Sequence, residues 1–212
     1  LEALDISQLA DALTGLIAGR EVQLPKYDFR TGRQLVGQKV QLTSDQVIIL
    51  EGIHGLNPRL LPGSLSERAF HIYGAALTQL NLDRHNRVST ADTRLIRRIV
   101  RDARERGYTA QQTISRWESV RRGEELHIFP YQENSDVMFN SALVYEMSAL
   151  QPLAEPLLRQ VPRGTAEFIE AKRLLAFLEW FLPVDVNLIP DNSILREFIG
   201  GSILKEFNIW KA

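Results

Sequence analysis

Residues 90–106 restrict the fold of this chain most, because their arginines and their aliphatic residues fall on opposite faces of a helix. The arginine face consists of Arg94, Arg97, Arg98 and Arg101, at positions i, i+3, i+4 and i+7. The aliphatic face consists of Ile96, Ile99, Val100 and Ala103. Neighbouring like charges on a helix cost about 0.2–0.5 kcal/mol per pair, and the acids nearby offset them only in part. We therefore expect the aliphatic face to pack in a core and the arginine face to bind an anion, with polyphosphate as the leading ligand.

The composition is that of an ordinary globular chain without a strong overall charge. Of 212 residues, 44% are hydrophobic and 24% are charged, and the net charge is −1, so any anion binding has to be local. Arginine outnumbers lysine by 20 to 5, which suits phosphate recognition but is equally explained by the base composition of the gene. The absence of cysteine excludes disulfides, thiolate metal sites and cysteine nucleophiles. Because no apolar run approaches about 18–20 residues and no signal peptide is visible, we expect a cytoplasmic protein without a membrane span.

Helical and extended patterns alternate along the chain and predict an α/β fold. Helices are expected over residues 5–18, 90–106, 109–120, 143–160 and 165–182. The aliphatic run at 47–50 predicts a strand that is buried on both faces of a parallel sheet, and 69–74 and 136–139 predict further strands. Glu51 would then stand at the C-terminal edge of the sheet, where ligands bind in open α/β folds. Residues 183–212 are expected to be an appended element outside the core.

Four motifs follow one another along the chain. They are Pro25-Lys26-Tyr27-Asp28-Phe29, the run from Val47 to Ile53, the helix from Thr93 through Glu105-Arg106-Gly107, and Ser135-Asp136-Val137. In this order they resemble the uridine kinase/phosphoribulokinase family of P-loop nucleoside and sugar kinases, over roughly residues 1–145. The continuation through residues 121–143 is similar to the longer bacterial uridine-kinase-like proteins. The resemblance implies part of a three-layer P-loop kinase fold with a mainly parallel sheet in residues 1–145, followed by a helical extension in 146–212.

The chain departs from the family at its phosphate-binding loop. That loop has the pattern G-x-x-x-x-G-K-[ST], and none of the five lysines here is followed by Ser or Thr. We therefore expect the chain to be the C-terminal portion of a kinase, inactive alone, whose loop and catalytic aspartate lie in an upstream segment of the same protein. Gly32 and Tyr108 also depart from the uridine kinase pattern, which expects a histidine and an arginine at those places. The resemblance therefore leaves the phosphoryl acceptor undecided between a nucleoside and a small sugar.

The resemblance also assigns roles to individual residues, with ATP and Mg²⁺ as cofactors. It implies catalytic roles for Glu51, Arg101 and Arg106, with Glu51 ordering Mg²⁺ through water. It implies substrate binding by Tyr27, Phe29, His54 and Arg98, and an arginine lid that extends to Arg121 and Arg122. Each role has a structural alternative: Glu51 and His54 as loop caps, the two aromatic residues as core, and the arginines as a solvated, salt-bridged face.

Two other classes of function stay open. The arginine helix could serve an RNA-binding module, although the near-zero net charge argues against nucleic acid as a partner. Alternatively, the chain could be a regulatory or scaffolding domain that kept a kinase-like fold and lost the phosphate-binding loop. The oligomeric state is also open, and a homo-oligomer is one of the alternatives.

Overall fold

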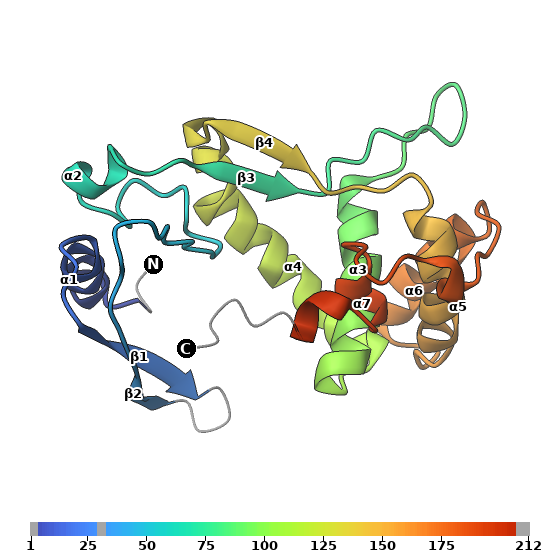
Figure 1. Cartoon of the computed structure of the whole chain (residues 1–212). Helices are drawn as coiled ribbons and strands as arrows, with labels where there is room; N and C mark the ends of the chain where they lie inside the picture. The colour runs from blue at the N-terminus through green and yellow to red at the C-terminus, as the bar shows by residue number, and fades with distance from the viewer. Residues whose placement is uncertain (1–3, 29–32, 207–212) are drawn as a thin grey trace. The chain divides into compact units, whose positions relative to one another are not determined.

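The computed structural model describes residues 4–28 and 33–206, which form two compact units (Figure 1). The first unit comprises residues 1–73 and 124–137, and the second comprises 74–123 and 138–212. Within the described ranges, no helix is both long enough and apolar enough to cross a membrane.

The first unit begins with a helix that packs beside a hairpin. Helix α1 (Ile6–Ile17) starts at Asp5, whose Oδ1 accepts a hydrogen bond from the Gln8 N–H at 2.9 Å, as expected for an N-cap. Strands β1 (Val22–Asp28) and β2 (Arg33–Val40) pair antiparallel, with Val22 opposite Val40. This unit also contains the short helix α2 (Gly63–Ser66), the 3₁₀ turn η1 (Phe129–Asn134) and the last residues of α4 (Ala110–His127).

The aliphatic run at residues 47–50 is not a strand, and this prediction is wrong. The run lies in no helix or strand, and the side chains of Val47 and Ile49 are 79% and 85% exposed. An aliphatic run indicates a preference for burial. A buried strand also needs partner strands that form hydrogen bonds with its backbone N–H and C=O groups. Among residues 4–28 and 33–206, no strand pairs with it. Glu51 is consequently exposed in an irregular segment and does not stand at a sheet edge.

The second unit is mainly helical. It contains α3 (Thr90–Arg106), most of α4 (Ala110–His127), α5 (Glu146–Arg159), α6 (Ala166–Leu178), η2 (Val186–Leu188), α7 (Arg196–Ile199) and η3 (Ile203–Glu206). Its core joins the aliphatic face of α3 to α5, α6 and the segment after α6. The buried centre includes Leu95, Ile96, Ile99, Leu150, Leu174 and Leu195.

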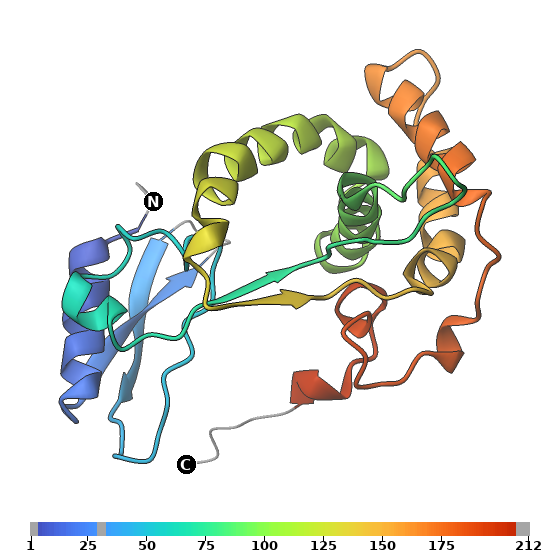
Figure 2. The same cartoon turned by 90° about the horizontal axis from the view of Figure 1, so that it is seen from above.

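The strands β3 (Ile72–Ala75) and β4 (Val137–Asn140) pair with each other and run in the same direction (Figure 2). Their first residues belong to the first unit and their last residues to the second. The predicted strands at 69–74 and 136–139 are therefore confirmed with small shifts. The predicted mainly parallel sheet is not confirmed, because the described residues form two separate two-stranded sheets, of which one is antiparallel. The α/β class itself is confirmed.

The segment after residue 183 is part of the core, and its prediction as an appendage is wrong. Ile189, Leu195 and Phe198 are buried in the same cluster as α3. Arg196 shapes this segment by donating hydrogen bonds to backbone carbonyls, among them those of Val186 at 3.2 Å and of Ile189. The apolar residues are too irregularly spaced for a helix, so no periodic pattern indicates their burial. The domain boundary predicted at residue 145 stays a prediction.

Candidate functional site

Helix α3 presents the arginines that the sequence singles out. Its N-cap is Ser89, and its helical conformation ends at Gly107, which has a positive φ of 66°. Leu95, Ile96 and Ile99 anchor one side of the helix in the core. The polar side is thereby fixed in direction, and most of its arginines stay accessible.

Three of the predicted site residues converge on one buried carboxylate, that of Asp102. Arg106 Nη1 donates to Asp102 Oδ1 at 3.1 Å. Arg98 Nε lies 3.4 Å from Oδ2, and Arg101 Nε lies 3.6 Å from Oδ1. Arg98 and Arg106 stand four positions before and after Asp102, so the helical repeat brings them to the same face. We call Arg98, Arg101 and Arg106 the arginine cluster.

The arginine cluster carries more positive than negative charge. Within the part of the chain that the structure describes, its three guanidinium groups form ion pairs with Asp102, and Arg101 Nη1 also lies 3.5 Å from the Glu197 carboxylate. The Asp102 residue is 2% exposed, whereas the Glu197 side chain is 57% exposed and largely hydrated. Because guanidinium groups bind phosphate through paired N–H donors, this surplus suits an anionic ligand with several oxygens.

Arg97 belongs to the predicted arginine face but is not available to a ligand. Its guanidinium is buried against Glu146, with Nη2 donating to Glu146 Oε2 at 2.7 Å and Nε donating to the other oxygen. The Phe198 ring covers the guanidinium at 4.9 Å. Arg104, which follows on the same helix, donates to the carbonyls of Glu197 at 2.6 Å and Phe198 at 3.1 Å.

The predicted site residues of the first unit are Tyr27, Glu51 and His54, while Phe29 lies outside the described residues. Tyr27 is exposed on β1. The His54 ring packs edge-on against His127 with their centroids 6.2 Å apart. Burial, with the charge of His127 adding to it, lowers the pKa of His54.

Glu51 does not form a magnesium site with other side chains of the described ranges. No group of three or more His, Asp or Glu residues with metal-binding geometry occurs there. Mg²⁺ in kinases is commonly held by one or two carboxylates together with substrate phosphates, so a single exposed carboxylate leaves most of the ligands to the nucleotide. The role of Glu51 at a magnesium ion therefore stays a prediction.

Arg121 and Arg122 lie inside α4 and not after a helix, because α4 extends to His127 and is longer than predicted. Both are exposed. Their assignment to a lid stays a prediction.

Sequence reasoning counted Asp102 only among the acids that partly offset the arginine face, and it missed Glu146, the buried partner of Arg97. A signal for Asp102 was present, since it stands four positions from both Arg98 and Arg106. Glu146 is 49 positions from Arg97, and nothing local reveals that pairing.

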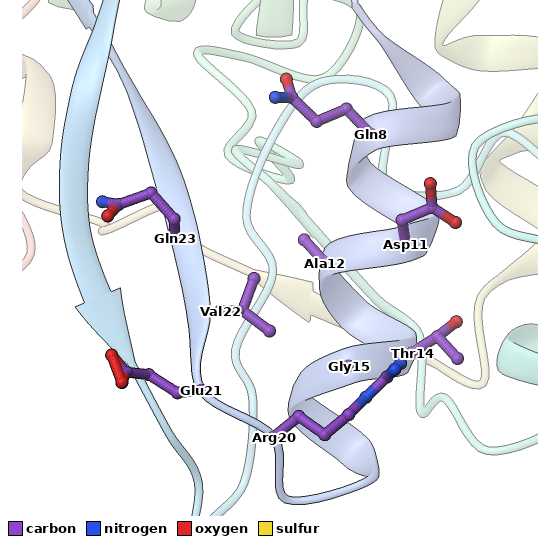
Figure 3. A pocket seen from close by; sticks show the side chains of 9 residues that line it. All are labelled: Gln8, Asp11, Ala12, Thr14, Gly15, Arg20, Glu21, Val22 and Gln23. Carbon is purple, nitrogen blue, oxygen red and sulfur yellow. The ribbon is translucent and has the colours of Figure 1, made fainter.

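A pocket of about 540 Å³ lies between α1 and β1 (Figure 3). Gln8, Asp11 and Thr14 line it from the helix and Gln23 lines it from the strand, with Arg20 in the connection between them. It contains none of the predicted site residues, and sequence reasoning did not find it.

Comparison with known proteins assigns the family. The profile of the phosphoribulokinase/uridine kinase family matches residues 1–148, and the chain belongs to that family. Among curated relatives, uridine-cytidine kinase A of Dictyostelium discoideum is 30% identical over 137 residues, which cover 64% of this chain and 24% of the relative. The uridine kinase of Tolumonas auensis is 29% identical, over 64% of this chain and 56% of the relative. The uridine kinase of Halalkalibacterium halodurans is 30% identical, over 64% of this chain and 57% of the relative.

The chain thus spans between a quarter and just over half of the length of these relatives. The matched region contains the whole of α3 with Asp102 and the arginine cluster, whereas Glu197 and Phe198 lie beyond it.

Proposed function

We propose that the protein acts as a kinase-type phosphotransferase, which moves the γ-phosphoryl group of ATP to a hydroxyl group of a nucleoside or a small sugar. The observation that carries this proposal is the arginine cluster on α3, within the region that matches the family. Phosphoryl transfer depends mainly on positioning and on neutralising charge at the transferring phosphate. Positively charged donors that are already in place supply that neutralisation without further rearrangement.

The names of the relatives, uridine kinase and uridine-cytidine kinase, favour a nucleoside as the acceptor. Tyr27 offers an exposed aromatic ring on β1 that can stack against a base. The departures at Gly32 and Tyr108 keep a small sugar as the second candidate. In this proposal, Arg98, Arg101 and Arg106 contact phosphate oxygens, Arg121 and Arg122 extend the lid, and His54 and Phe29 contribute to the acceptor site.

The proposed reaction also needs a phosphate-binding loop. No lysine of the chain has the Gly-Lys-Ser/Thr context of such a loop, so the proposal places it in sequence upstream of Leu1. Mg²⁺ would be held by the nucleotide phosphates with Glu51 acting through water. We expect this chain alone to show only background phosphoryl transfer.

The test is release of ADP from ATP with a panel of nucleosides and small sugars. It compares this chain with a longer form that carries a phosphate-binding loop. We expect turnover by the longer form only, and Arg101→Gln should reduce its kcat by about 10²–10³-fold. The control is Arg159→Gln, which removes an exposed arginine that pairs with Glu155 on α5 and should leave kcat unchanged. A longer form that neither binds nucleotide nor turns over would contradict the proposal and favour a scaffolding role.

A further inference from the structure

The position of Asp102 is unfavourable for an acid. It lies near the C-terminal end of α3, where the helix dipole disfavours negative charge, and it is almost fully buried. A buried carboxylate loses its hydration, and ion pairing offsets that loss only where the geometry is good. Asp102 is surrounded by three arginines within 3.6 Å of its oxygens, and all three were assigned to the phosphate site for other reasons.

We infer that Asp102 is a positioning residue that holds Arg98, Arg101 and Arg106 as one preformed polyphosphate-binding cluster. The inference takes its ligand class from the proposed function, but it concerns anion binding and not phosphoryl transfer. Asp102 acts through the arginines and does not itself touch the ligand.

The atoms that contact Asp102 support this role. Arg98 and Arg101 approach the carboxylate with Nε, and their four terminal Nη groups carry the remaining donors. Arg106 uses only Nη1. The carboxylate thus lies near one nitrogen of each arginine and accepts a hydrogen bond from Arg106. The buried Nε of Arg101 makes no hydrogen bond within the described residues, so its interaction with Asp102 at 3.6 Å is an ion pair without a hydrogen bond.

Glu197 provides a matched comparison within the same cluster. Its carboxylate also contacts Arg101, but it is more than half exposed and belongs to the segment that lies beyond the family match. If these two acids acted only through their charge, then neutralising either one would strengthen the binding of an anion. If Asp102 positions the arginines, neutralising it weakens binding, whereas neutralising Glu197 does not.

The experiment is calorimetric titration of the full chain with inorganic tripolyphosphate, at low and at physiological ionic strength. For Asp102→Asn we expect the affinity to fall by about ten-fold or more, because the three guanidinium groups lose the buried carboxylate that they share. For Glu197→Gln we expect equal or tighter binding. Arg98→Gln combined with Arg106→Gln should abolish binding, which shows that the titration reports on the cluster. Equal or tighter binding by Asp102→Asn overturns the inference, and so does a wild-type chain that binds no tripolyphosphate.

Circular dichroism spectra and unfolding curves accompany each titration, so that a loss of binding is read only from folded protein. Should Asp102→Asn not fold, Asp102→Glu decides the question. It keeps the charge but shifts the carboxylate outward, and we expect weaker binding by a folded variant. Unchanged affinity would overturn the inference. The outcome is separate from that of the ADP assay. If the longer form has no kinase activity, the titrations still test whether Asp102 holds the cluster. If Asp102 is dispensable for binding, the ADP assay still tests kinase activity.

Discussion

Arg97 of α3 and Glu146 of α5 form a buried ion pair, in which Arg97 Nη2 donates to Glu146 Oε2 at 2.7 Å. The backbone carbonyl of Ser141 accepts a further bond from Arg97 at 2.9 Å. The pair joins two helices of the same core and satisfies an arginine that the sequence places among ligand-binding residues. Arg97 is therefore a structural residue, in contrast to Arg98 beside it.

Removing one partner of this pair leaves an uncompensated buried charge. We expect Glu146→Ala to lower the free energy of unfolding by about 3–5 kcal/mol. Urea denaturation followed by circular dichroism measures the change. The double variant Arg97→Met with Glu146→Leu keeps the volume and removes both charges, so it should lose much less stability than Glu146→Ala. A double variant as unstable as the single one would contradict this account.

The exposure of residues 47–50 gives a second prediction. Replacing Val47 or Ile49 by Ser should change the free energy of unfolding of this chain by no more than about 0.5 kcal/mol, as for other exposed positions. The control is Leu95→Ala in the core of α3, which should cost about 2–5 kcal/mol. A loss of several kcal/mol at Ile49 would show that the run is buried after all.

Gly200 and Gly164 form a matched pair for a third prediction. Both have a positive φ, of 91° and 86°, so alanine is strained at either position. A Cβ at Gly200 would also lie 2.7 Å from Arg104 Nη1, whereas a Cβ at Gly164 would meet nothing within 4 Å. Arg104 would have to move, which would weaken the bonds of its Nε and Nη2 to the carbonyls of Phe198 and Glu197. Thermal unfolding should show that Gly200→Ala costs about 1–2 kcal/mol more than Gly164→Ala. Equal losses would mean that Arg104 moves without cost.

The lowered pKa of His54 predicts a dependence of stability on pH. The folded protein binds a proton at His54 less tightly than the unfolded chain does, so protonation favours unfolding. Stability from this group is unchanged above about pH 6.5, falls as the pH drops below that value, and levels off below the folded-state pKa. Urea midpoints between about pH 8 and about pH 5 should therefore fall less for His54→Gln than for wild type. His85→Gln, in an exposed loop, should keep the wild-type dependence.

The sequence predicted the local elements far better than their assembly. The helices expected over residues 5–18 and 90–106 are present as α1 and α3, because periodicity and caps act within a few turns of the chain. The strand predicted at residues 47–50 is absent, because an aliphatic composition indicates a preference for burial but does not identify a partner strand. The same distinction applies to the site. The convergence on Asp102 follows from the helical repeat, whereas Glu146 and Glu197 are 49 and 96 positions away from their arginines.

The hydrogen bond from Arg104 to the Phe198 carbonyl joins residues that are 94 positions apart. It can therefore form only after nearly all of the chain has been synthesised. Chains leave the ribosome from the N-terminus, so α3 emerges long before the residues that cover its side. Until Phe198 has been released, the Arg97 guanidinium lacks the ring that lies over it and Arg104 lacks its two carbonyl acceptors. The nascent helix therefore stays open to chaperones and proteases until the last residues of the core are translated, and a premature stop codon before residue 198 leaves it so permanently.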